Sequence, residues 1–126
     1  MTALLRQLWP QPVALKSYGD GAFRFAETRH AGALCILPDG VHAWRPSDIA
    51  EVTEADFQPL LAHRQAVDFI LFGCGEQHMP PPPWLARLAA LAGLGLEVMT
   101  TGAAVRTYNL CRDEMRLPAT FLLPVA

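Results

Sequence analysis

The chain has 126 residues, of which 52% are hydrophobic and 17% are charged, and its formal net charge is −2. This length and composition predict one domain with a sizeable hydrophobic core. Nucleic acid is not expected as a partner, because its binding needs a concentrated lysine and arginine surface and the sequence has no basic block. No apolar run approaches the roughly 20 residues of a membrane-spanning helix, so membrane insertion is not expected.

The cysteines argue for a reducing compartment. Cys35, Cys74 and Cys111 are odd in number and form no CxxC or CxxH pair, which disfavours a disulfide framework and a structural zinc site. The segment Met1–Trp9 carries only a short apolar patch before Pro10, unlike a secretory signal. We therefore expect a cytoplasmic protein.

Residues 1–11 are interpreted as an arm beside the domain. Leu4, Leu5 and Leu8 recur at helical spacing, which favours one or two helical turns that end before Pro10. The alternative is a loosely packed terminus that frays.

Three apolar segments in the N-terminal half predict an antiparallel meander. In Ala22–Phe25 the two phenylalanines alternate with Arg24, which is the period of a half-buried strand. Ala33–Leu37 is an unbroken apolar run typical of a strand covered on both faces. Asp39 and Gly40 form a turn signal, because glycine tolerates the positive φ angle of a tight hairpin. Val41–Trp44 is the expected returning strand.

A helix is expected to start at Thr53. Its hydroxyl and the carboxylate of Asp56 have the spacing of a capping box. Pro59 follows closely, and a proline inside a helix removes one hydrogen bond and clashes with the preceding turn. We therefore predict a kink, or a single turn followed by a new helix at about residues 58–64.

The last half of the chain predicts a βαβαβ unit. Strands are expected at residues 67–72, 96–99 and 119–123, and helices at residues 84–92 and 102–114. Their short links predict right-handed crossovers and largely parallel strands. On the second helix an inward apolar face is predicted from residues that recur at helical spacing, namely Ala104, Tyr108, Cys111 and Met115.

A candidate anion site follows from two loops of this unit, residues 73–75 after the first strand and residues 100–102 after the second. Ligands of open α/β sheets bind outside the carboxyl ends of the strands, where both loops are expected. The second loop opens directly into a helix, whose free amides attract anions, and Arg106 stands in the first turn, where a cation is unfavourable unless an anion lies beside it. The candidate ligand-binding residues are Gly73, Cys74, Gly75, Thr100, Thr101, Gly102, Arg106 and Asn109.

Two alternatives to this site remain open. In the structural alternative, Thr101 caps the helix, and Arg106 pairs with an internal acid such as Asp68, Glu97 or Asp113. In the catalytic alternative, Cys74 is an accessible loop thiol and His78 lowers its pKa, although no third residue orients the imidazole. No metal or cofactor is expected, because the four histidines lack metal-ligand spacing and no phosphate-loop or dinucleotide motif is present.

The run GLEVMTTGAAVRTYN at residues 95–109 resembles the signature segment of a small domain family of unknown function. This family includes mitochondrial complex I assembly factor 3 and an adipogenesis-associated domain protein, and the chain is identified as a bacterial member. The resemblance extends over residues 17–125. Further stretches resemble the opening motif, the hairpin and the glycine loop of the family, namely Ser17–Phe23, Leu37–Val41 with Trp44, and Asp68–Gly75.

The resemblance implies a compact domain with a central mixed sheet, helices on one side and a β-hairpin layer on the other. It implies no established enzymatic activity and no cofactor, and one eukaryotic branch serves respiratory complex I assembly by binding proteins. Four residues depart from the family pattern: Cys74 stands in place of threonine, Thr100 of aspartate, Val105 of cysteine and Met115 of glycine.

Together, the residues and the resemblance predict an α/β fold in a single domain over residues 1–126. It combines a central mixed sheet, an N-terminal antiparallel β-hairpin layer and a C-terminal βαβαβ unit with helices packed on the sheet. We expect a non-enzymatic domain that acts through protein–protein contacts, as an assembly or accessory factor with a protein partner. The alternatives are a small anion-binding domain and, third, a Cys74-dependent enzyme, and a homo-oligomer is compatible with the sequence.

Overall fold

The computed structural model describes residues 5–126. Its strands are β1 (Arg6–Trp9), β2 (Leu15–Gly19), β3 (Ala22–Phe25), β4 (Thr28–Ala31), β5 (Ala33–Leu37), β6 (Gly40–Trp44), β7 (Phe69–Gly73), β8 (Gly95–Met99) and β9 (Ala119–Leu122). Its helices are α1 (Glu54–Phe57), α2 (Pro83–Ala92) and α3 (Thr101–Asp113), with the 3₁₀ helices η1 (Ile49–Glu51) and η2 (Gln58–His63). No helix in this part of the chain is long and apolar enough to cross a membrane.

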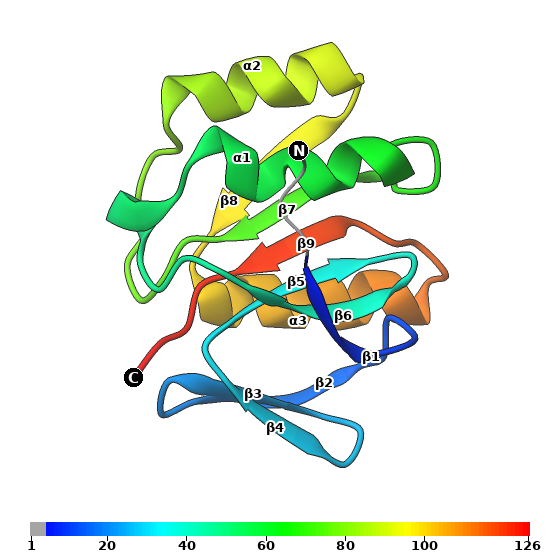
Figure 1. The fold of residues 1–126 in the computed structure, drawn as a ribbon, viewed down its shortest axis with the longest axis vertical. Coiled ribbons are helices and arrows are strands. Elements are labelled where there is room, and N and C mark those ends of the chain that lie inside the picture. Colours follow the sequence, from blue (N-terminus) through cyan, green and yellow to red (C-terminus); the bar gives the residue numbers. More distant parts are fainter. Residues whose placement is uncertain (1–4) are drawn as a thin grey trace.

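A six-stranded mixed sheet forms the centre of the molecule, in the order β1-β6-β5-β9-β7-β8 (Figure 1). A separate antiparallel sheet, in the order β2-β3-β4, lies against one side of it. In the large sheet β7 pairs in parallel with both β8 and β9, as predicted for the C-terminal βαβαβ unit. The predicted α/β fold with a central mixed sheet and an N-terminal β-hairpin layer is therefore confirmed.

The predicted meander is divided between the two sheets. β5 and β6 form the expected hairpin, in which Leu37 pairs with Gly40 and Gly40 has a φ angle of +135°. All five residues of β5 are buried, which confirms that both of its faces are covered. β3, in contrast, pairs with β2 and β4 in the small sheet. The chain changes sheets at Gly32, whose φ angle of +118° favours glycine.

The N-terminal arm is a strand rather than a helix. Arg6–Trp9 pairs antiparallel with β6, with Arg6 opposite Ala43 and Trp9 opposite Val41. Two turns of isolated helix are marginal in water, whereas the free edge of β6 offers backbone hydrogen bonds to the same residues. The prediction of helical turns is therefore wrong for residues 6–9, and Leu4 lies outside the described residues.

The helix predicted at Thr53 is confirmed as one α-helical turn. The Asp56 carboxylate accepts hydrogen bonds from the backbone nitrogen of Thr53 at 2.8 Å and from its hydroxyl at 3.0 Å. Beyond Phe57 the chain continues as the 3₁₀ helix η2, which contains Pro59. The missing amide of proline favours this change, because it removes an α-helical hydrogen bond.

The inward face of α3 is confirmed except at Met115. Ala104, Tyr108 and Cys111 are buried, but Met115 is 96% exposed and lies beyond the end of the helix at Asp113. Its φ angle is +60°, a left-handed conformation that disfavours residues with a side chain. The chain therefore leaves the helical path before Met115, and this residue was wrongly predicted to face the core.

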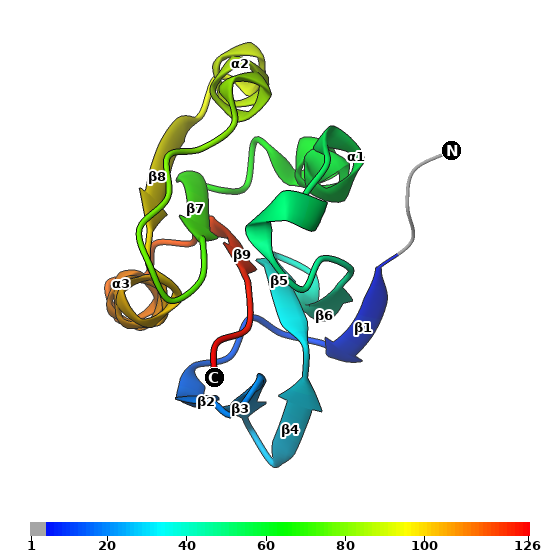
Figure 2. The same ribbon diagram turned by 90° about the vertical axis from the view of Figure 1, so that its left-hand side faces the viewer.

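Different layers cover the two faces of the large sheet (Figure 2). On one face Phe57, Leu60, Leu85 and Leu88 from α1, η2 and α2 pack in one core cluster. On the other face α3 and the small sheet share a second cluster, which includes Tyr108, Phe23 and Phe25. The arrangement implied by the resemblance, with helices on one side only, is thus corrected: α3 lies on the side of the small sheet.

Candidate functional site

The two candidate loops lie side by side at the carboxyl ends of β7 and β8. The Thr101 backbone nitrogen donates a hydrogen bond to the Gly75 carbonyl at 2.9 Å. In return, the Gly75 nitrogen donates to the Thr101 hydroxyl at 3.0 Å. The loop that contains Gly73, Cys74 and Gly75 is therefore fastened to the start of α3.

The Thr101 side chain is used by the fold. It is fully buried, and its hydroxyl also donates to the Leu123 carbonyl at 2.8 Å. With one bond donated and one accepted, this hydroxyl joins the loop to the end of β9. The helix cap is Thr100, whose hydroxyl accepts from the Ala103 nitrogen at 3.4 Å. The alternative in which Thr101 caps the helix is therefore wrong by one residue.

Two glycines of the candidate site permit close packing. A Cβ atom on Gly73 would lie 2.9 Å from Leu122 Cδ2 and 3.1 Å from Thr101 Cα. A Cβ atom on Gly102 would lie 2.5 Å from the Tyr18 hydroxyl. Gly73 thus lets α3 approach the sheet, and Gly102 makes room for Tyr18 of the small sheet.

Arg106 is exposed and points to the small sheet. Its Nη1 donates a hydrogen bond to the Tyr18 hydroxyl at 3.4 Å, and it has no ion-pair partner within residues 5–126. Asp68, one of the acids considered as its partner, instead accepts from the Leu117 nitrogen at 2.7 Å. The alternative in which Arg106 pairs with an internal acid is therefore wrong.

Arg106 and the two loops line a shallow cleft of about 330 Å³. Its walls carry one positive and one negative side chain, Arg106 and Glu76, and Glu76 Oε1 accepts from the Ala126 nitrogen at 3.1 Å. Such a cleft can hold a small anion against the guanidinium. The other residues that line it are Tyr18, Gly75, Thr100, Gly102, Val125 and Ala126.

Cys74 is buried and forms no pair with His78. Its Sγ donates to the Gln77 carbonyl and accepts from the Met79 nitrogen, both at 3.4 Å, and only 4% of the residue is exposed. His78 lies exposed on the same loop. The prediction of an accessible thiol is wrong, because Sγ closes a turn of the loop. The arrangement offers no nucleophile and base within hydrogen-bonding distance at this position.

Asn109 is not among the residues that line the cleft and instead holds the start of β2 in the small sheet. Its Nδ2 donates to the Leu15 carbonyl and its Oδ1 accepts from the Leu15 nitrogen, both at 2.9 Å. The Tyr108 hydroxyl donates to the Val13 carbonyl at 2.8 Å, and burial raises the pKa of Tyr108 against a smaller opposing effect of Arg112. Asn109 is thus placed where it stabilises the fold, apart from the other candidate residues.

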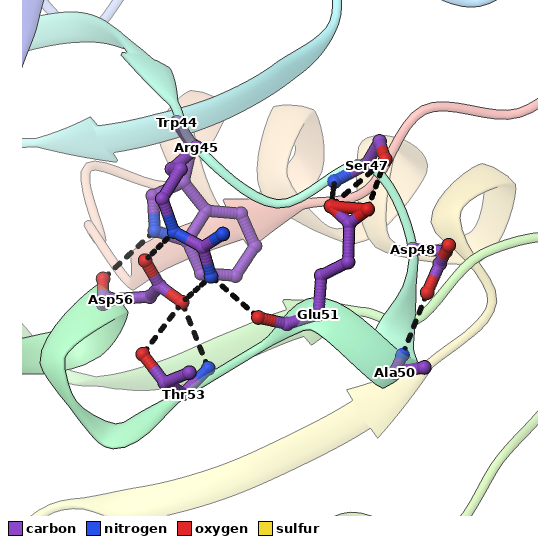
Figure 3. A network of polar contacts seen from close by, with 8 residues as sticks. All are labelled: Trp44, Arg45, Ser47, Asp48, Ala50, Glu51, Thr53 and Asp56. Atoms are coloured by element: carbon purple, nitrogen blue, oxygen red, sulfur yellow. Dashed lines mark hydrogen bonds and ion pairs between the residues drawn. The ribbon is translucent and has the colours of Figure 1, made fainter.

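A polar network missed by sequence reasoning fastens β6 to α1 (Figure 3). Arg45 donates two hydrogen bonds to the Asp56 carboxylate, at 2.9 Å and 2.6 Å, and Trp44 Nε1 donates to the Asp56 carbonyl at 2.8 Å. Burial alone raises the pKa of Asp56, but the hydrogen bonds from Arg45 and Thr53 outweigh it and lower the pKa below its ordinary value. The capping-box spacing pointed to Asp56, but nothing in the pattern pointed to Arg45.

A groove that the sequence did not indicate lies between β8 and α3. We call it the β8–α3 groove, and its volume is about 490 Å³. Its lining includes apolar and acidic side chains, and one guanidinium, that of Arg116, lies 5.5 Å from the ring centre of Phe69. The groove could not be read from the sequence because it depends on β8 being the last strand of the sheet.

The fold is similar to that of a Bordetella pertussis protein described as a Mth938-like domain, which superposes with a TM-score of 0.73 at 26% identity, over 89% of this chain and 85% of that protein. A crystallised outer membrane protein from Bartonella henselae superposes with a TM-score of 0.89 at 30% identity, over 94% of this chain and 99% of that protein. The family model described as "Protein of unknown function (DUF498/DUF598)" matches residues 15–123. The chain belongs to this family, which confirms the resemblance seen in the sequence.

Two relatives match most of the chain. It is 25% identical over 122 residues to NADH dehydrogenase [ubiquinone] 1 alpha subcomplex assembly factor 3 of Mus musculus. That match covers 97% of this chain but only 66% of the mouse protein, so the mouse protein is the longer one. An uncharacterised protein of Rhodobacter capsulatus is 32% identical over 111 residues, which cover 88% of this chain and 84% of that protein.

Proposed function

We propose that this protein is a non-enzymatic domain that acts through protein–protein contacts as an assembly or accessory factor. One observation carries the proposal: apart from Arg106, the groups of the family signature and the glycine loop that were candidates for chemistry are occupied by internal hydrogen bonds. Thr101, Asn109 and the Cys74 thiol each bond to the backbone of another part of the fold. These groups build the domain, so its surface remains the part available for function.

The mouse relative supports the kind of function proposed. It is named an assembly factor of a subcomplex, and contact with the proteins being assembled is the kind of action that we infer from this name. We transfer to this chain the kind of action and not the mouse protein's partner, because the match covers only 66% of the longer mouse protein. The proposed partner is therefore a protein, recognised by an exposed surface of this domain.

Photo-crosslinking inside cells tests this proposal. A photoreactive amino acid replaces one exposed side chain at a time, at Tyr18, Leu61, Leu91 or Leu110, which are 40%, 38%, 88% and 60% exposed. We expect at least one position to yield the same crosslinked protein repeatedly, as identified by mass spectrometry. Samples kept from light are the control. Absence of a light-dependent protein adduct from every position would contradict the proposal.

A second candidate function is favoured by the surroundings of Arg106. Its guanidinium is exposed beside the start of α3 and shares a cleft with the Gly75 loop, which suits a small carboxylate or phosphate. NMR titration with inorganic phosphate tests this function. Binding predicts saturable shifts of the Gly75 and Gly102 amides that Arg106→Gln abolishes and Arg87→Gln, on α2, retains. Shifts that do not saturate would exclude it.

The proposal includes a cytoplasmic location. Cys35, Cys74 and Cys111 are all free thiols and buried, and free thiols are maintained in reducing compartments. Cell fractionation with antibody detection checks this, with recovery in the cytosolic fraction as the expected result. Recovery in a washed membrane fraction would instead contradict the location.

A further inference from the structure

β8 presents a regular open edge of the large sheet. It pairs only with β7, over five consecutive residues and without a bulge, and no strand of residues 5–126 pairs with its other edge. The opposite edge of the sheet, β1, is interrupted by a register shift between Gln7 and Trp9. Unpaired backbone groups of a flat edge are a template for another strand, whereas a bulge disrupts such pairing.

The two faces of this edge differ in chemistry. Leu96 and Val98 are half-buried and pack with the apolar cluster under α2. Glu97 is exposed and lines the β8–α3 groove on the other face. Because side chains of a strand alternate between faces, an added strand would place every second side chain beside the apolar pair and the others beside Glu97.

The groove has an excess of negative charge. It contains the carboxylates of Asp68, Glu97 and Glu114 against the single guanidinium of Arg116. On the α3 side, Leu110 is 60% exposed and offers an apolar contact at the rim. Charge complementarity therefore favours an occupant with basic side chains on this face.

A second copy of the chain is a poor occupant of the same edge. If two β8 strands paired antiparallel over all five residues, Glu97 would lie directly opposite Glu97 of the other copy, since it is the central residue of Gly95–Met99. Like charges directly opposite each other destabilise a sheet. The edge thus disfavours this register of self-pairing and remains open to a basic segment.

We propose that the β8 edge and the β8–α3 groove bind an extended segment of a partner protein in which basic and apolar residues alternate. The segment pairs with β8 as a further strand, with apolar side chains beside Leu96 and Val98 and a basic side chain beside Glu97. This inference rests on the proposed function and names the surface and the chemical class of the partner.

Synthetic heptapeptides test the inference on the full chain. One peptide alternates lysine with valine, a second alternates glutamate with valine, and a third is the lysine peptide with a central proline. Binding is followed by NMR titration, and amide hydrogen exchange is measured at Gly95–Met99. We expect the lysine peptide alone to bind saturably and to slow exchange in β8, because proline removes a backbone donor and glutamate meets like charge.

Charge reversal supplies the matched variants. Glu97→Lys is expected to weaken binding of the lysine peptide about fivefold or more and to permit binding of the glutamate peptide. Glu27→Lys makes the same change at a 95% exposed side chain on another part of the surface and should leave both affinities unchanged. Equal effects of the two variants would overturn the inference, as would equal binding of the lysine and proline peptides or unchanged exchange in β8.

Failure of this inference and failure of the proposed function have different signatures. A partner crosslinked repeatedly through Leu61 or Leu91 but never through Leu110 would support the proposed function and overturn the use of this groove. If the chain forms a dimer without peptide and amide exchange in β8 is slow in that dimer, a second copy occupies the edge, and the inference is overturned. Absence of crosslinking from every position would count against the proposed function even if the lysine peptide binds.

Discussion

Asn109 and Leu15 are joined by a pair of hydrogen bonds across 94 positions of the sequence. The Asn109 side chain donates to the Leu15 carbonyl and accepts from the Leu15 nitrogen, both at 2.9 Å. It thereby acts like one residue of a neighbouring strand at the start of β2. This contact holds the small sheet to α3 and explains part of the family signature without a ligand.

Replacement of Asn109 by alanine should destabilise the protein. The substitution leaves a partly buried amide and carbonyl of Leu15 without their partner, which costs about 1–3 kcal/mol. Urea unfolding followed by circular dichroism measures the change. Gln65→Ala, at an exposed turn position, is the control and should shift the free energy of unfolding by less than about 0.5 kcal/mol. A similar small shift for Asn109→Ala would contradict the role assigned to this contact.

Met115→Gly should stabilise the protein by about 1 kcal/mol. The methionine has a left-handed φ angle of +60°, which costs a residue with a side chain about 1–2 kcal/mol of stability. Glycine removes this cost, but its greater freedom in the unfolded chain offsets part of the gain. The side chain is 96% exposed, so little packing is lost. Leu110→Gly, inside α3, should instead destabilise by about 1 kcal/mol. Destabilisation by both variants would show that Met115 is not strained.

The Arg45–Asp56 pair should make stability depend on pH at acidic values. The pKa of Asp56 is lower in the folded protein than its ordinary value of 3.8. The ionised carboxylate therefore contributes to the free energy of unfolding above pH 3.8, and this contribution is lost as the pH falls through the folded pKa. Between pH 5 and pH values below 3.8, the free energy of unfolding measured in urea should fall less for Arg45→Gln than for the wild type. Arg64→Gln, at an exposed position, should retain the wild-type loss.

Cys74 should react slowly with thiol reagents in the folded protein. Its Sγ is buried and bonded within the loop, and access is required for reaction. Limited labelling with a maleimide, followed by peptide mass spectrometry, should show far slower modification than in protein unfolded in urea. Labelling of Cys74 at the unfolded rate would restore the hypothesis of a reactive thiol.

The elements with clear periodicity could be predicted from the sequence. The βαβαβ unit and the β5–β6 hairpin follow from apolar runs, helical spacing and turn residues, and the two candidate loops meet because parallel strands end at one edge. β1 was missed because Leu5 and Leu8 also fit a helix. β2 and β4 were missed because exposed residues such as Lys16 and Arg29 obscure the alternation.

The roles of the site residues depend on partners distant in sequence. Nothing near Asn109 indicates that its amide reaches Leu15, and nothing near Cys74 indicates that its loop folds back over the thiol. The open edge of β8 likewise follows from the order of six strands, which local patterns do not determine. The local sequence therefore predicted which loops meet, but it predicted more side chains available for ligand binding than the structure leaves without internal partners.

Reconstitution with the crosslinked partner tests the central claim most directly. The purified chain and the identified protein are mixed, and complex formation is measured by analytical ultracentrifugation. The proposed function predicts a saturable complex that forms without any added small molecule, and the groove inference predicts that Glu97→Lys weakens it while Glu27→Lys does not. If the two folded proteins form no complex at concentrations well above those in cells, the account of this domain as a protein-binding factor is contradicted.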